Sequence, residues 1–387
     1  MKKYLFLFLF FAALTPGLFA QSAKSFYDEA QKATSEQDKI KLYTKAINKA
    51  PNWSLAYHRR ADIYKDQKRY KKALEDYSNA IKYSSKDPFK YYARALAYYE
   101  QGSYTLAIED LTKAINLKNN YEDFYLKRAM CYMQNGKYKQ ALNDLKKVKK
   151  TDTKFLQAQA YYELHDYRTA DNLLEELLAK NPQDTQALLY LGKIRYNIEF
   201  YDEAIGYFSH ILNIEPDNIA ALKARANAFK EIDLYDQVIK DYTTLIKIAP
   251  EDAASYNRRG VAYERIKEWQ KAIEDYDKAI ELNPKWAVPY NNRAYSLMKL
   301  KRFKEAKQDL DSALKLAPKA PTVLVNTAGY YWTAKKDKKN MYSYLQDAMK
   351  NNFTDFDSLY DDNQKGWLFK TINESLEFRS FSAPYDK

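Results

Sequence analysis

Residues 253–286 read AASYNRRGVAYERIKEWQKAIEDYDKAIELNPKW, and the pattern of this stretch decides the fold. Its small and aromatic residues recur at steps of three or four, which is the spacing of one face of an α-helix. There are two such runs: Tyr256, Gly260 and Tyr263, then Ala272, Tyr276 and Ala279. Pro284 follows the second run, where it closes a helix and sets the next turn. The stretch therefore predicts a helix, a tight turn and a second helix.

The same pattern returns every 34 residues, with one shorter step of 29 between Ala141 and Ala170. Eight clear units start near residues 54, 88, 122, 151, 185, 219, 253 and 287. Proline closes five of them, at 182, 216, 250, 284 and 318. One helix pair cannot bury both of its apolar faces, so neighbouring units must stack into a solenoid.

These units resemble the tetratricopeptide repeat (TPR) in the placing of their small and aromatic residues. The resemblance covers about residues 22–350 and implies an all-α fold, a right-handed α-solenoid of about ten helix-turn-helix units. A degenerate unit at 21–53 precedes the eight units of 54–320, and a second one at 321–350 follows them. Residues 351–387 break the period, and we expect C-terminal capping helices there, which terminal repeats need.

Residues 1–20 have the pattern of a signal peptide. Lys2 and Lys3 precede a short apolar run, and Ala20 offers a cleavage point before Gln21. Glutamine at this place, rather than cysteine, argues against a lipid anchor. We expect an exported protein, in the periplasm or cell envelope rather than the medium, without a membrane span after cleavage. The alternative is an uncleaved N-terminal anchor.

The sequence shows no catalytic or metal-binding pattern. Its three histidines lie in different repeats, and the single cysteine, Cys131, cannot form an internal disulfide. Phosphate-binding, nucleophile-elbow and zinc motifs are missing from the sequence, so we expect neither an enzyme nor a cofactor nor a metal. The net charge of +12 is spread among interleaved acids and bases, which does not favour nucleic-acid binding.

A paired substitution pattern links the two helices of a unit. Six units carry arginine at their seventh position and aspartate at their twenty-third, and the units without this arginine also lack the aspartate. Matched substitution implies contact, so we predict an interhelical ion pair in each of the six; the alternative makes the arginines ligand contacts. The structural pairs are Arg60 with Asp76, Arg94 with Asp110, Arg128 with Asp144, Arg225 with Asp241, Arg259 with Asp275, and Arg293 with Asp309.

The TPR resemblance implies that first helices line a concave groove, with certain positions facing inward and free of packing. In the third to sixth repeats these positions are mostly apolar: Phe89, Tyr92, Leu96, Tyr99, Leu126, Met130, Met133, Phe155, Tyr162, Leu189 and Tyr196. In later repeats they are polar: Lys223, Asn227, Asn257, Arg265 and Asn291. Such a lining suits an extended or helical peptide, whereas the alternative is that the apolar residues only complete the packing.

We therefore expect an exported protein-interaction scaffold that binds a partner protein or peptide in this groove, in cell-envelope or secretion-related assembly. Whether the resulting complex is membrane-associated is left open. Two alternatives remain, which are a carbohydrate- or cell-wall-binding protein and a non-catalytic regulatory subunit of an envelope enzyme. Tyrosine faces would serve the former.

Overall fold

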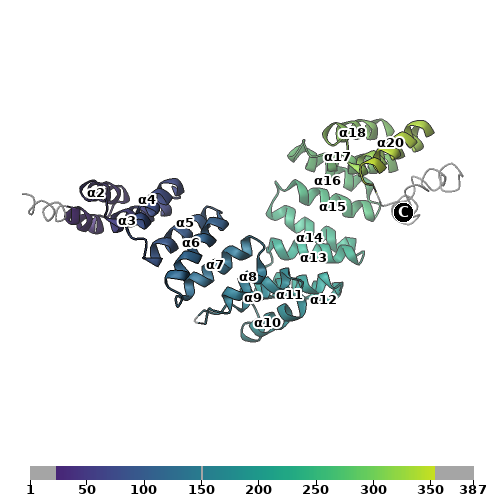
Figure 1. Cartoon of the computed structure of the whole chain (residues 1–387). Helices are drawn as coiled ribbons and strands as arrows, with labels where there is room; N and C mark the ends of the chain where they lie inside the picture. Colours follow the sequence, from purple (N-terminus) through teal and green to yellow (C-terminus); the bar gives the residue numbers. More distant parts are fainter. Residues whose placement is uncertain (1–22, 150, 354–387) are drawn as a thin grey trace, which may run out of the picture. The chain divides into compact units, whose positions relative to one another are not determined.

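The computed structural model describes residues 23–149 and 151–353, and Figure 1 traces their helices. The described residues form helices joined by turns and contain no strand, which confirms the predicted all-α solenoid. The predicted signal peptide and most of the predicted capping region lie outside the described residues. The helices form two compact units, divided between Pro182 and Gln183.

The first unit consists of consecutive hairpins. A helix at 23–32 and α2 form the degenerate first repeat, and the following pairs are α3 with α4, α5 with α6, α7 with α8, and α9 with α10. The bounds are α2 Glu36–Lys49, α3 Ser54–Asp66, α4 Tyr70–Tyr83, α5 Pro88–Glu100, α6 Tyr104–Leu117, α7 Glu122–Gln134, α8 Tyr138–Leu145, α9 Lys154–Glu163 and α10 Tyr167–Lys180.

The second unit continues the pattern. Its bounds are α11 Thr185–Asn197, α12 Tyr201–Ile214, α13 Ile219–Glu231, α14 Tyr235–Ile248, α15 Ala253–Arg265, α16 Trp269–Leu282, α17 Ala287–Lys299, α18 Phe303–Leu316, α19 Pro321–Tyr330 and α20 Lys338–Lys350. A π-helical turn, η1 (Tyr331–Lys335), extends α19 before α20 begins. The degenerate tenth repeat is thus a hairpin whose first helix ends irregularly.

The 29-residue step has a local explanation. The helix α8 has 8 residues, whereas the second helix of an ordinary repeat, such as α16, has 14. The next helix, α9, is also shorter than the 13 residues of α11. The shortening is therefore absorbed at the junction of the fourth and fifth repeats, within the first unit.

Small residues let the two helices of a hairpin approach closely. The Gly260 position shows this closeness, because a Cβ atom there would lie 2.7 Å from Cε1 of Tyr276. The Tyr276 ring is itself fully buried, and so is Ala272 on the same helix. Close packing of this kind explains why small residues recur at the same place in each unit.

From the second repeat to the tenth, each turn within a hairpin uses a residue in the left-handed backbone region. The φ angle is +82° at Gly102 and +68° at Gly136, but non-glycine residues such as Lys68, at +58°, occupy the equivalent position elsewhere. The amide of the following residue then donates back to the first helix, as Arg69 does to the Tyr64 carbonyl at 2.8 Å. This is the Schellman ending of a helix.

Candidate functional site

The structure brings together all six predicted Arg–Asp pairs. In the eighth repeat, Nε of Arg259 donates to Oδ2 of Asp275 at 2.9 Å, and Nη2 donates to Oδ1 at 2.7 Å. The same two-bond arrangement joins the other five pairs. The aspartates are buried and their arginines are largely so. Planar two-bond pairing of this kind fixes orientation as well as distance.

Each of these arginines makes a further bond that the sequence analysis missed. Nη1 of Arg259 donates to Oγ1 of Thr243 in the preceding repeat at 3.1 Å. The corresponding partners of the other five are Thr44, Ser78, Thr112, Ser209 and Asp277. A hydroxyl or carboxylate residue 16 positions before each arginine was the available signal. The arginines therefore link successive repeats as well as the helices within a repeat.

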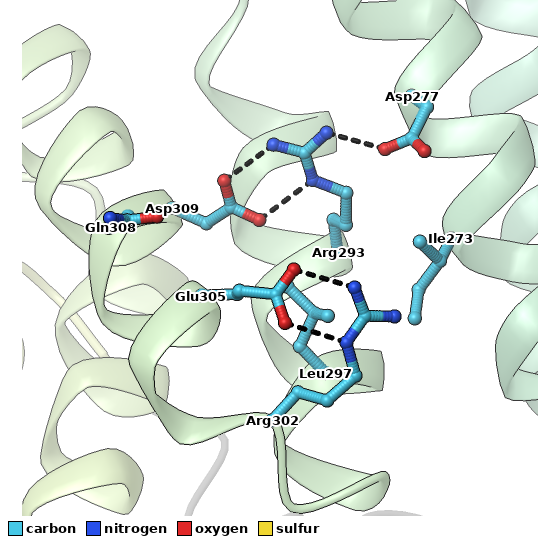
Figure 2. A pocket seen from close by; sticks show the side chains of 8 residues that line it. All are labelled: Ile273, Asp277, Arg293, Leu297, Arg302, Glu305, Gln308 and Asp309. Carbon is cyan, nitrogen blue, oxygen red and sulfur yellow. Dashed lines mark hydrogen bonds and ion pairs between the residues drawn. The ribbon is translucent and has the colours of Figure 1, made fainter.

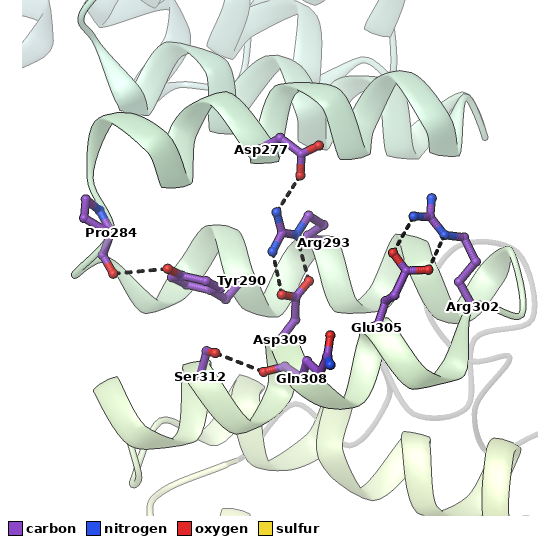
Figure 3. A network of polar contacts seen from close by, with 9 residues as sticks. All are labelled: Asp277, Pro284, Tyr290, Arg293, Arg302, Glu305, Gln308, Asp309 and Ser312. Atoms are coloured by element: carbon purple, nitrogen blue, oxygen red, sulfur yellow. Dashed lines mark hydrogen bonds and ion pairs between the residues drawn. The ribbon is translucent and has the colours of Figure 1, made fainter.

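The last of these links lies beside a small polar cavity in the second unit. Figure 3 shows Arg293 between Asp277 of the preceding repeat and Asp309 of its own. The cavity has a volume of about 280 Å³, and Figure 2 shows that Arg302 and Glu305 face it as well. Because Arg302 donates two hydrogen bonds to Glu305, at 2.8 and 2.6 Å, its charge is balanced within the chain.

The first helices of successive repeats contact one another, which places them on a common face. Such contacts join α3 with α5, α11 with α13, α15 with α17, and α17 with α19. Side chains bridge other first helices: the Tyr92 ring of α5 lies 5.0 Å from the Phe124 ring of α7, measured between centroids. The first helices therefore lie side by side within each unit, and we call the surface that they form the first-helix face.

On the first-helix face of the first unit, aromatic residues are partly covered. Phe89 keeps 38% of its surface exposed, whereas Tyr92 and Tyr99 are half-buried. Burial raises the pKa of Tyr92 to about 12. Lys127 of the next repeat lies 4.7 Å from the centroid of the Tyr99 ring, a cation–π distance. These rings are thus held in place while retaining an accessible side.

The other apolar residues predicted for this face are also partly buried. Leu126 and Met133 pack against a core of Ala129, Ala141 and Leu145. The half-buried residues of the predicted set in this unit are Tyr92, Leu96, Tyr99, Leu126, Met130, Met133, Phe155 and Tyr162. Part of each side chain therefore serves packing, and the remainder reaches the surface.

In the second unit, the predicted residues differ in their exposure to solvent. Leu189, Tyr196, Asn227 and Arg265 are half-buried, whereas Lys223 is exposed. The Tyr196 hydroxyl donates to Oε1 of Glu231 in the next first helix at 3.2 Å. Lys223 lies 3.4 Å from Oδ2 of Asp252, measured from its Nζ. Polar contacts between repeats thus involve several of these side chains.

Asn257 and Asn291 differ from the expectation that they are free of packing. Both are buried, and each accepts a hydrogen bond from an asparagine of the following repeat. Nδ2 of Asn292 donates to Oδ1 of Asn257 at 3.2 Å, and Nδ2 of Asn326 donates to Oδ1 of Asn291 at 3.0 Å. A buried amide must find such partners, so these two side chains join first helices together.

Glu264, near the end of α15, was not singled out from the sequence. Its Oε2 accepts from the Tyr276 hydroxyl at 2.9 Å and from the Ser296 hydroxyl at 3.3 Å. Burial raises the pKa of this carboxyl to about 7, and burial likewise lowers the pKa of nearby Lys299 to about 8. The carboxyl thus titrates near neutral pH beside two hydroxyls and the Lys299 ammonium.

Cys131 is fully buried, and burial raises the pKa of its thiol to about 11, so its thiolate is disfavoured at neutral pH. Within residues 23–149 and 151–353, no cluster of histidine, cysteine and acidic residues could hold a metal ion. Over the same residues, none of the helices has the length and apolar character needed to cross a membrane.

Comparison with solved structures finds helical-repeat proteins at low identity. A fragment of MamA from Desulfovibrio magneticus RS-1 is 21% identical over 43% of this chain and 97% of its own, with a TM-score of 0.41. Yeast Tom70 is 18% identical over 84% of this chain and 82% of its own, also with a TM-score of 0.41. Likeness at this level says nothing about function. A search of curated proteins finds no match to the sequence.

Repeat families match the sequence directly. Tetratricopeptide repeat families match residues 122–155, 155–219, 253–285 and 287–320, and a TPR repeat family matches residues 61–102 and 96–136. These matches together cover more than half of the chain. The chain therefore belongs to the tetratricopeptide repeat proteins.

Proposed function

We propose that the chain is a non-catalytic scaffold that binds a peptide segment of a partner protein on the first-helix face of its first unit. The observation that carries this proposal is the set of half-buried aromatic, leucine and methionine side chains on α5, α7 and α9. An apolar patch that is exposed to solvent usually marks an interaction site.

The composition of this face suits a peptide ligand. Met130 and Met133 are flexible and adapt to different apolar side chains, whereas Tyr92 and Tyr99 are held by neighbouring rings. Rigid aromatic anchors lose little entropy on binding, and they dominate the energetics of many interfaces. Fully buried alanines such as Ala95 and Ala129 form the hairpin cores, so the larger side chains are only partly required for packing.

Site-specific photocrosslinking tests the proposal. A photoreactive amino acid at Met130 is expected to crosslink a protein in extracts of the source cells, and Tyr92→Ala should reduce the yield of that adduct. Leu106 provides the matched control, because it is an exposed apolar residue on the second helix α6. A crosslinker at Leu106 should not give the same adduct. Equal adducts from both positions, or a glycan adduct at Met130, would contradict peptide binding on this face.

We also propose that the protein acts after export, in the cell envelope and as part of an envelope or secretion assembly. The basis is the signal-peptide pattern of residues 1–20. Fractionation of the source cells, with N-terminal sequencing of the isolated protein, tests this. A mature chain beginning at Gln21 outside the cytoplasm is expected. A chain that keeps residues 1–20 in the cytoplasm would refute it.

A further inference from the structure

Four successive turns of the second unit share one geometry. They join α11 to α12, α13 to α14, α15 to α16, and α17 to α18. At each, the middle residue has a φ angle between +58° and +65°. The next amide donates to a first-helix carbonyl at 2.9 Å in all four turns. Equivalent side chains are therefore presented in the same way four times along this edge of the unit.

These turns carry apolar residues that face solvent. The residue before the left-handed position is Ile198, Ile232, Ile266 or Leu300, and Phe200 and Leu234 stand just after it in the first two turns. Five of these six side chains are between 37% and 56% exposed, and Ile232 is half-buried. We call this row the turn ridge. The equivalent residues of the first unit include Gln67, Gln101 and Asn135, so repeat packing does not require an apolar residue here.

The charges at the left-handed position of these turns are ordered along the turn ridge. The left-handed residues are, in sequence, Glu199, Asp233, Lys267 and Lys301, and all four are exposed. Two negative charges are thus followed by two positive ones, at equal intervals of 34 residues. A second copy of this row, placed antiparallel to the first, sets each negative residue opposite a positive one.

We propose that the turn ridge binds the turn ridge of a second copy of the chain in a two-fold symmetric, antiparallel dimer. A two-fold axis between the second and third turns sets Glu199 opposite Lys301 of the second copy, and Asp233 opposite Lys267 of the second copy. The same axis sets Ile198 against Leu300 and Ile232 against Ile266. Apolar burial supplies the affinity, and the opposed charges select the antiparallel register. This inference does not rest on the proposed peptide site.

Charge reversal distinguishes this dimer from non-specific hydrophobic association. The full chain is expected to dimerise in analytical ultracentrifugation at protein concentrations of up to about 100 μM. A variant with Glu199→Lys and Asp233→Lys, or one with Lys267→Glu and Lys301→Glu, carries a single sign at the four left-handed positions and should be monomeric. An equimolar mixture of the two variants should form a heterodimer, because all four contacts are again between opposite charges.

Matched variants test whether the apolar residues of the turn ridge contribute to dimerisation. Ile266→Gln with Leu300→Gln introduces the residue that the first unit carries in this place, and should weaken dimerisation by about a hundred-fold, since symmetry counts each change twice. Lys68→Glu, at the same left-handed position of a first-unit turn, should leave it unchanged. Circular dichroism checks that every variant is folded. A full chain that stays monomeric, a dimer indifferent to both charge reversals, or a mixture that stays monomeric overturns the proposal.

Discussion

Truncating Asp275 to alanine should destabilise the eighth repeat more than the loss of a surface ion pair would. The Asp275 side chain is 7% exposed and that of Arg259 is 17% exposed, so solvent screens the pair weakly. The variant leaves the guanidinium in place with Thr243 as its remaining partner. An exposed pair contributes about 0.2–1 kcal/mol, whereas breaking a buried pair on one side costs about 3–5 kcal/mol. We expect a loss of about 3 kcal/mol in the free energy of unfolding.

The chain itself offers the matched replacement for a double-mutant cycle. The sixth repeat has Leu191 and Tyr207 at the two equivalent positions, and it folds as an ordinary hairpin, α11 with α12. Arg259→Leu combined with Asp275→Tyr therefore replaces the ion pair by a combination that the fold accepts. Each single variant leaves one buried charge without its counter-ion, but the double variant leaves none. We expect a coupling free energy of about 2 kcal/mol or more.

Urea unfolding followed by circular dichroism measures the free energies, and hydrogen exchange of the α15 and α16 amides shows whether the loss is local. Local readout matters because repeat arrays do not always unfold in one step. A coupling free energy below about 0.5 kcal/mol would refute the reasoning, because it would mean that Arg259 and Asp275 contribute independently. Equal loss of protection in every repeat would argue against a local effect.

Three further predictions concern particular residues. Gly260→Ala should destabilise by about 1–3 kcal/mol because its Cβ would meet the Tyr276 ring, whereas Gly206→Ala, with no atom near its Cβ, should stabilise by up to ~1 kcal/mol in thermal unfolding. Lys68→Gly should stabilise by about 1 kcal/mol, since φ is positive there. Glu264 has a folded pKa of about 7 against an ordinary 4.5, so its ionisation costs stability as pH rises through this window. Glu264→Gln should therefore gain up to ~3 kcal/mol relative to wild type between these pH values in urea titrations, and a gain that does not change with pH would contradict this.

Much of the fold could be predicted because ten similar units occur in one chain. Comparing the units located the hairpins and the shortened step before Ala170, which the short helix α8 accommodates. The same comparison predicted the Arg–Asp contacts, because the arginine and the aspartate are either both present or both absent in a repeat. It did not predict the irregular η1 turn, because the tenth repeat departs from the others and has no equivalent to compare with.

The groove residues were harder to predict, because exposure depends on neighbouring repeats. Asn257 and Asn291 occupy positions that the family leaves open, yet both are buried and accept hydrogen bonds from asparagines of the next repeat. The Arg259–Thr243 bond escaped prediction for a related reason, since it joins two repeats, whereas the matched substitutions lie within one. The elevated pKa of Glu264 likewise arises from burial, which no local pattern reports.

The sequence by itself determined the hairpin unit, its period and the contacts within each unit, because helical spacing and matched substitution act over a few turns of chain. Only the tertiary structure decided the contacts between repeats. It determines which asparagine amides are buried, which arginines bind a residue of the preceding repeat, and which turn residues remain exposed. The physical reason is that stacking sets the distance and burial of side chains about 16 or 35 residues apart, and these quantities control hydrogen bonding and charge.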